Sequence, residues 1–328
     1  MVHLRIVVPS ERSEKVLGLL EATPSASNLV FFPGAARRPA GDVLLVDIAR
    51  EEASVVIDDL KELHVPRDGS IALEQIDSQL SDSAEAAERA AQGAPSDAVV
   101  WEEVEARTQE STELSGTFVA FMIVACLLAS VGIFLGSPIL IIGAMVVGPE
   151  FGPLAGFCVA FVERRRKVAV RSLTALVVGF PIGITAAYLF TLICEATGLI
   201  DSTFRGSDHP LTQFISHPDE FSFIVAALAG TAGVLSLTSA KSGALVGVLI
   251  SVTTIPAAAN VGVAAALSDW SEWRGAMAQI SINLIAIVLA GLTTLHLQRR
   301  LFEQRRRRHL GEGSREVAGL PGEDDSSQ

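Results

Sequence analysis

Cysteine and positive charge are both scarce in this chain. Its three cysteines, Cys126, Cys158 and Cys194, all lie within long apolar stretches, where cysteine usually serves as a small hydrophobic residue. This placement argues against a disulfide framework or a cysteine-based metal site. Lys and Arg number 25 against 37 for Asp and Glu, and the resulting net charge of -12 argues against nucleic acid as a partner.

The sequence also lacks the short motifs of the common enzyme classes. It has no Walker loop, no glycine fingerprint for dinucleotides, no HExxH pair and no Ser-His-Asp or Cys-His arrangement. We therefore expect no enzymatic activity and no cofactor, with an intramembrane enzyme as a minor alternative. The N-terminal residues carry no positively charged leader and no apolar run of signal-peptide length, so the first transmembrane helix is expected to direct insertion.

Long apolar runs are abundant, and they are confined to one part of the chain. Acids are frequent and apolar runs short before Leu114, whereas residues 114–297 are mostly apolar stretches separated by short charged loops. A helix needs about 20 apolar residues to cross a bilayer. The sequence therefore predicts an all-α membrane bundle of about six spans, at residues 114–135, 138–162, 168–194, 221–239, 242–267 and 275–297.

Loop charges predict the orientation of these spans. The basic loop 163–167 and the Arg-rich segment 299–308 should face the cytoplasm, and the acidic loops 195–220 and 268–274 fit the outside. With six spans, all four loops lie on the side of the membrane that their charges predict only if both chain termini are cytoplasmic. We expect a multi-pass plasma-membrane protein in contact with lipid, with a basic juxtamembrane segment and a disordered acidic tail at residues 298–328.

A small soluble domain is predicted at residues 1–77. Short β-branched runs and two amphipathic segments follow one another in the order β-α-β-β-α-β, the ferredoxin-like arrangement. Such α+β modules often sense ligands, and a structural or oligomerising role is an equal alternative. Residues 78–113 are Ala- and Glu-rich, and we interpret them as an acidic linker followed by a short approach helix.

The predicted spans divide into two groups of three. An offset of 104 residues places Gly143 over Gly247 and Ala155 over Ala259, and the middle span of each group contains proline. Groups with an odd number of spans must have opposite orientations, so the sequence predicts an inverted 3+3 repeat with two Pro/Gly-interrupted helices. Secondary transporters with this architecture bind substrate where the broken helices meet.

Candidate site residues gather around these two predicted breaks. Glu150 is an ionisable residue midway through the second span, which is costly and indicates ion or proton handling; a wetted Glu at a re-entrant tip is the alternative. Hydroxyl and amide groups near the second break could face it, although any one of them more often bonds to its own backbone. The candidate substrate or ion site comprises Gly148, Pro149, Glu150, Gly152, Pro153, Thr253, Thr254, Pro256, Asn260 and Asn283.

A metal site is conceivable only in the long loop before the fourth span. His209 and His217 lie there beside several acids, but His-Pro pairs in irregular loops are more often turn formers. No metal is therefore included in the predicted site.

One motif resembles a known family. Gly143-Ala144-Met145 is followed by Gly148-Pro149-Glu150-Phe151-Gly152-Pro153, with Ser137-Pro138 and the Trp101-Glu102-Glu103 segment upstream. These residues resemble the domain-of-unknown-function family 389, also called the uncharacterised hydrophobic domain, over residues 99–290. The resemblance implies a polytopic bacterial or archaeal membrane protein, often with a small N-terminal domain, and it implies no particular activity. The family often has an apolar residue where Glu150 stands, so no family-wide carboxylate mechanism is implied.

Two functions remain open at this point. The first is a transporter or channel-like permease for an ion or small solute, regulated by the cytoplasmic module. The second is a membrane sensor or scaffold, in which the module binds a ligand or partner and the membrane part positions it or forms a homo-oligomer. A polar site between the two breaks would favour the first function.

Overall fold

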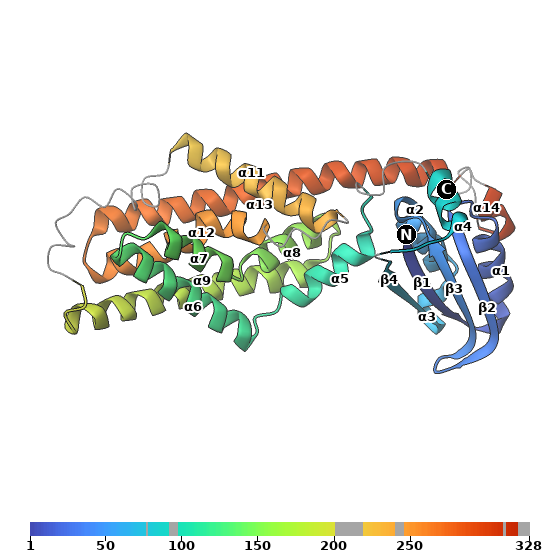
Figure 1. Cartoon of the computed structure of the whole chain (residues 1–328), viewed down its shortest axis with the longest axis horizontal. Coiled ribbons are helices and arrows are strands. Elements are labelled where there is room, and N and C mark those ends of the chain that lie inside the picture. Colours follow the sequence, from blue (N-terminus) through green and yellow to red (C-terminus); the bar gives the residue numbers. More distant parts are fainter. Residues whose placement is uncertain (77, 92–97, 201–218, 240–245, 311–312, 321–328) are drawn as a thin grey trace. The chain divides into compact units, whose positions relative to one another are not determined.

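The computed structural model describes residues 1–76, 78–91, 98–200, 219–239, 246–310 and 313–320 (Figure 1). Within helices, the side chains of residues 110–111 and 246–253 are outside this description. The chain divides into two compact units. The first comprises residues 1–104, 238–241 and 298–328, and the second comprises residues 105–237 and 242–297.

An antiparallel four-stranded sheet forms the centre of the first unit. Its strands are β1 (Val2–Val8), β2 (Ala26–Arg37), β3 (Ala40–Ile48) and β4 (Ser70–Gln75), in the order β2-β3-β1-β4. Along β1 the side chains at alternate positions, Val2 to Val8, are buried, as expected for a strand that covers a core with one face. The strands and the two longer helices of this part of the chain follow one another in the predicted order β-α-β-β-α-β.

Two amphipathic helices supply the other half of this core. Helix α1 (Ser10–Glu21) buries Val16, Leu19 and Leu20, and helix α2 (Arg50–Glu62) packs its apolar face into the same cluster. The short helix α3 (Val65–Asp68) leads from α2 into β4. Burial of these apolar side chains is the main contribution to the stability of the unit.

The segment expected to be a linker contains two helices. Helix α4 (Asp82–Ala90) is capped by Ser81, whose hydroxyl accepts a hydrogen bond from the Ala84 amide, and α5 (Trp101–Ser111) is the expected approach helix. The first turn of α5 is held to α2, because Arg50 pairs with Glu103 at 2.8 Å. Trp101 is buried within the first unit against Phe302.

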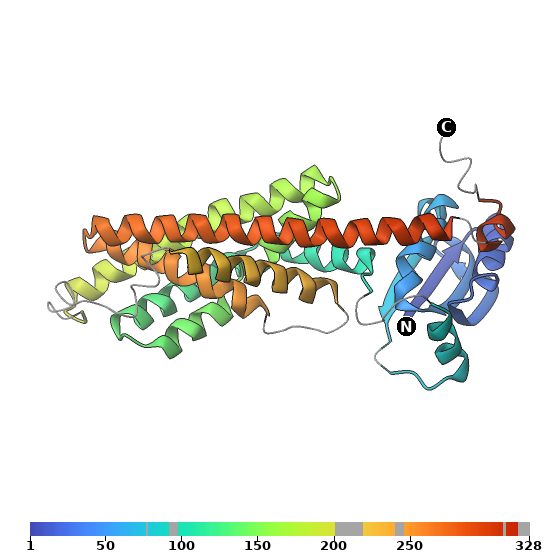
Figure 2. The ribbon, with the colours of Figure 1, turned by 90° about the horizontal axis from the view of Figure 1, so that it is seen from above.

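The C-terminal segment is also more ordered than the sequence suggests. Helix α13 (Trp270–His309) continues twelve residues beyond the expected end of the last span at Leu297, and Figure 2 shows it as one uninterrupted helix. The expectation of a disordered tail after Leu310 is wrong for residues 313–320, because helix α14 (Gly313–Val317) is present there. The physical reason is a pair of contacts with α2, in which the buried Arg315 contacts the buried Asp59 and the partly exposed Glu62.

The second unit is helical and strongly apolar. Four described helices are long and apolar enough to cross a membrane, and the bent pair α7–α8 adds a fifth span if it is counted as one. The apolar part of α12 at residues 254–266 is shorter. The helices are α6 (Gly116–Phe134), α7 (Pro138–Val147), α8 (Phe151–Val162), α9 (Arg166–Ala196), α11 (Glu220–Thr238), α12 (Val246–Ala266) and the α13 residues up to Leu297.

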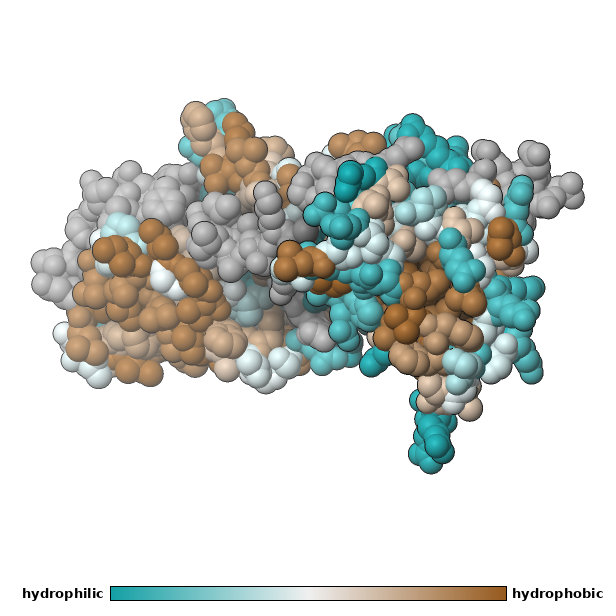
Figure 3. Space-filling view, turned by 45° about the vertical axis from the view of Figure 1, so that its right-hand side comes forward, coloured by the Kyte–Doolittle hydropathy of each residue, from teal (hydrophilic) through white to brown (hydrophobic). Residues whose placement is uncertain are grey.

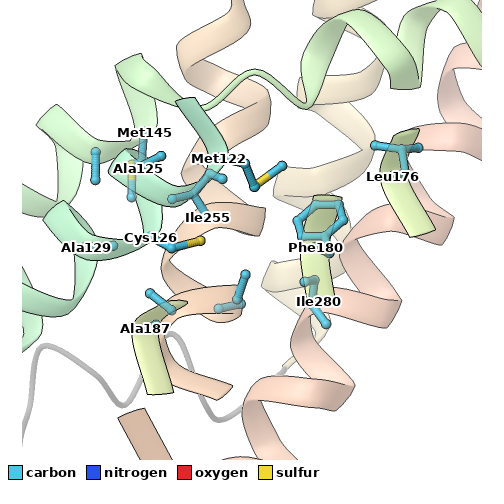
Figure 4. Close-up of a cluster of buried hydrophobic side chains, with 14 of the residues drawn as sticks. Met122, Ala125, Cys126, Ala129, Met145, Leu176, Phe180, Ala187, Ile255 and Ile280 are labelled. Carbon is cyan, nitrogen blue, oxygen red and sulfur yellow. The ribbon is translucent and has the colours of Figure 1, made fainter. Parts of the chain in front are cut away.

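The apolar side chains of this unit both fill its core and cover its surface. Figure 4 shows the core, where Met122 and Cys126 of α6 lie near Phe180 and Ala187 of α9 and Ile255 of α12. On the face drawn in Figure 3, hydrophobic residues gather over the second unit. Ile139, for example, is 81% exposed. Exposed apolar surface of this extent is typical of a protein whose solvent is lipid.

One of the two expected helix interruptions is absent. Helix α12 continues through Pro256 as a single helix, so the prediction of a break in the fifth span is wrong. Proline removes only its own backbone donor, and neighbouring helices allow such a position to remain helical in a membrane protein. The break in the second span is present, between α7 and α8.

Candidate polar site at the α7–α8 break

The break between α7 and α8 places one short segment of non-helical backbone within the apolar unit. Helix α7 ends at Val147, α8 begins at Phe151, and the two helices are bent by 48°. The Gly148 amide still bonds to the Ala144 carbonyl at 3.2 Å, but Pro149 has no backbone donor with which to continue the ladder. The Gly-Pro pair therefore ends α7, and Glu150 is the residue immediately before α8, where its side chain makes no capping hydrogen bond.

Glu150 is fully buried at this break and is hydrogen-bonded to a residue of α12. The Thr254 hydroxyl donates to Glu150 Oε1 at 2.7 Å, and both side chains have no solvent-exposed area. A carboxyl group in an apolar environment is stabilised only by such polar contacts, because burial disfavours its charged form by several kcal/mol or more.

The other candidates near the break lie on both sides of this pair. Gly152 and Pro153 occupy the first turn of α8, where a proline costs no hydrogen bond. Pro256 is buried on α12, two residues beyond Thr254. Thr253 belongs to α12, but its side chain is outside the described set. The pair Glu150–Thr254 thus joins the region of the break to the helix that packs against α6, α7 and α9.

Two further candidates form polar pairs with residues that were not among the predicted site residues. Asn260 of α12 donates to Glu272 Oε2 of α13 at 3.4 Å, and the buried Asn283 accepts from Gln279 Nε2 at 3.4 Å. Gln279 is four residues before Asn283, so a polar i, i+4 pair in an apolar stretch was the available signal. Glu272 was assigned to an outer loop, and nothing in the local pattern linked it to Asn260.

The spacing of the bonded pair coincides with the offset between the two halves of the sequence. Glu150 and Thr254 are 104 residues apart, the same offset that aligns Gly143 with Gly247. Equivalent positions of two halves can contact each other only where they lie close to the axis that relates the halves. In an inverted repeat with this offset, the hydrogen bond would lie close to the axis that relates the two halves.

Within the described ranges, no group of three His, Cys, Asp or Glu side chains is arranged to hold a metal ion. The loop with His209 and His217 lies outside the described residues. The chemistry of the site, as far as it is described, is therefore that of a carboxyl group, a hydroxyl and the backbone of a helix break.

Comparison with known proteins finds a family model that matches residues 145–289. This region matches the family model described as "Domain of unknown function (DUF389)", which confirms the resemblance expected from the Gly-Pro motif. The chain is 26% identical to "Uncharacterized protein MJ0678" of Methanocaldococcus jannaschii over 196 residues, which are 59% of this chain and 58% of the archaeal protein. No solved structure matches the chain. Neither description names an activity.

Proposed function

We propose that this chain, which matches the DUF389 family model over residues 145–289, is a six-span membrane permease for an ion or small solute. The support for six spans is the set of four long apolar helices, the bent pair α7–α8 and the apolar α12. Loop charge supports the orientation, because Arg164, Arg165, Arg166 and Lys167 all follow α8. In this topology both termini are cytoplasmic.

An inverted 3+3 repeat is the second part of the proposal. Spans one to three and four to six then have opposite orientations, with α7–α8 and α12 as their middle members. The contact between Glu150 and Thr254, at equivalent positions of the two halves, supports this symmetry. In transporters built on inverted repeats, substrate and coupling-ion sites lie at the interface of the repeats near the bilayer midplane.

The observation that carries the proposal is the buried Glu150–Thr254 hydrogen bond at a helix break. A carboxyl group inside the membrane-spanning unit is costly and therefore indicates a function in the movement of ions or protons. Protonation would remove the charge of Glu150 and weaken its interaction with a bound cation. We therefore expect a proton or a monovalent cation to be the species whose movement depends on Glu150.

The first unit is proposed to be a ferredoxin-like regulatory module in the cytoplasm. The strand order β2-β3-β1-β4 and the two helices on one core support this fold. Helix α13 belongs to both units, because its residues up to Leu297 are in the second and those from Gln298 are in the first. This continuity also favours the second candidate function, in which the module senses a ligand and α13 transmits the change.

Proton and sodium movement into proteoliposomes tests the permease. Purified protein is reconstituted into liposomes that contain a pH-sensitive dye in one set and a Na⁺-sensitive dye in another, and a gradient of Na⁺ or a membrane potential is imposed. We expect Glu150→Gln to reduce the flux by at least about tenfold, because each 1.36 kcal/mol of barrier changes a rate tenfold. Thr254→Val removes one hydrogen bond to the carboxyl group and should reduce it by about tenfold to a hundredfold.

Glu220→Gln is the matched control, because Glu220 is an exposed acid at the first turn of α11. It should leave the flux unchanged. Flux that is equal in wild type and Glu150→Gln would remove the carboxyl group from the mechanism. A wild-type flux no greater than that of empty liposomes, for both ions, would contradict the permease and leave the sensor as the better proposal.

A further inference from the structure

An apolar groove lies on the outside of the second unit, between α8, α9 and α13. Its volume is about 490 Å³. Leu173, Val177 and Ile184 of α9 form one wall, and Ile285 and Leu289 of α13 form another. The hydroxyl of Ser281, the polar side chain in the lining, donates to its own backbone at Met277 O over 2.8 Å. The groove therefore offers apolar contacts and no hydrogen-bonding site for a polar solute, which separates it from the Glu150 site.

The face of α9 that forms this wall continues beyond the groove to the positively charged Arg166. Arg166, Leu173, Val177 and Ile184 follow one another at intervals of seven, four and seven residues, which places them on one face of the helix. Val170 continues the same face between Arg166 and Leu173 and is 63% exposed. A single stripe therefore runs from an exposed cation at the first residue of α9 into the groove.

The Arg166 side chain has no ion-pair partner among the described residues, unlike the side chains of Arg165 and Arg171. Arg165 pairs with Glu105, and Arg171 pairs with Glu113 at 2.9 Å. The exposed Arg166 side chain has no ion pair or side-chain hydrogen bond within the part of the chain that is described. A cation in this position is complementary to an anionic group located at the end of the apolar stripe.

The length of the groove decides between two apolar occupants. Leu173 and Ile184 are eleven residues apart, which is about 16 Å along a helix. One leaflet of the hydrocarbon core is about 15 Å thick, and the whole core is about 30 Å. An acyl chain fits this length, whereas a spanning helix from a second copy of the chain would extend over about twice the distance.

We infer that this groove binds one acyl chain of an anionic phospholipid, with the phosphate of its headgroup on Arg166. The inference depends on the membrane-spanning part of the proposed function and not on the permease activity. Removing the cation should abolish the preference for an anionic headgroup without abolishing chain binding. Filling the groove should abolish binding of both anionic and neutral lipids.

Native mass spectrometry of the detergent-purified full chain tests this site. The probes are dioleoyl phosphatidylglycerol and dioleoyl phosphatidylcholine, which have the same acyl chains and differ in headgroup charge. Wild type should bind one phosphatidylglycerol in preference to phosphatidylcholine, and Arg166→Gln should reduce that preference about fivefold. Lys167→Gln is the matched control, because it removes the same charge from the next residue on a different face of α9, and it should change the preference less than twofold.

Val177→Trp places a large side chain in the groove and should remove the bound lipid of either kind. Equal losses of preference in Arg166→Gln and Lys167→Gln would overturn the site, since a general attraction to the basic loop would then explain the binding. A wild-type dimer that Val177→Trp converts to a monomer would also overturn it, because a second copy would then be the occupant. Failure of the protein to enter membranes at all would instead contradict the six-span proposal.

Discussion

At the scale of residues, the sequence does not distinguish basic side chains that would anchor the chain to lipid from those that form ion pairs within the protein. The Arg-rich segment after Leu297 has the pattern of a membrane anchor, yet Arg306 contacts Asp58 and lies 2.6 Å from Glu62 Oε1. These partners are separated by 244 to 248 residues, so no local pattern could link them. Glu150 was recognisable from the sequence because an acid within an apolar run is conspicuous by itself.

Asp59 is the centre of the buried ion cluster in the first unit. It is 1% exposed and contacts both Arg315 and His309, the latter at 2.8 Å. Removing one partner of a buried ion pair leaves the other charge poorly compensated, which typically costs about 3 to 5 kcal/mol. We expect Arg315→Met to destabilise the first unit by about that amount, measured by hydrogen exchange of the α2 amides in the full-length protein.

The exposed pair Arg12–Asp68 provides the control for Arg315→Met. Its two side chains are 34% and 45% exposed, so Arg12→Met should cost less than about 1 kcal/mol. Equal effects of the two substitutions would show that the Asp59 cluster is no more important than a surface ion pair. Rapid exchange in α14 alone would show that the C-terminal helix is released without destabilising the sheet.

At the scale of elements, the sequence predicted most boundaries where a single physical signal dominated. Short β-branched and apolar runs located the strands, and Pro149 and Pro153 located the break between α7 and α8. Pro256 gave the wrong result because its neighbours keep α12 helical, which is a tertiary effect. The C-terminal end of α13 and the whole of α14 were missed because their sequences are polar and they are stabilised by ion pairs with α2.

Close packing of α9 and α12 depends on one glycine. A Cβ atom at Gly262 would lie 2.5 Å from the Ile184 carbonyl oxygen and 2.8 Å from Ala187 Cβ. Small residues allow membrane helices to approach closely, and a larger side chain must push them apart. We expect Gly262→Val to lower the unfolding temperature in detergent. It should also lower the fraction of protein that elutes as a single species in size-exclusion chromatography.

Gly143→Val is the matched control, because a Cβ atom at Gly143 of α7 would have no neighbour within 4 Å. It makes the same chemical change in the same unit and should leave the unfolding temperature within about 2 °C of wild type, which corresponds to less than about 1 kcal/mol for a protein of this size. If Gly262→Val behaved in the same way as Gly143→Val, the α9–α12 contact would not be close-packed.

At the scale of the whole molecule, the proposed permease requires the chain to cross a membrane six times. The apolar surface of the second unit supports insertion, and the loop charges support one orientation. The sequence predicts six apolar stretches because hydropathy is a local property, and the described helices include four long apolar ones, the bent pair α7–α8 and the shorter apolar part of α12. It could not predict the Glu150–Thr254 contact, because that contact depends on how α12 packs beside the α7–α8 break.

Cysteine labelling from the two sides of the membrane tests the topology most directly. The three native cysteines are replaced by alanine, and single cysteines are introduced at four exposed positions: Glu14, Arg164, Thr197 and Ser268. A membrane-impermeant maleimide is applied to spheroplasts and to inverted vesicles. Six spans with cytoplasmic termini predict that Thr197→Cys and Ser268→Cys react only in spheroplasts, whereas Glu14→Cys and Arg164→Cys react only in inverted vesicles. Labelling of Arg164→Cys and Thr197→Cys from the same side would contradict the six-span account.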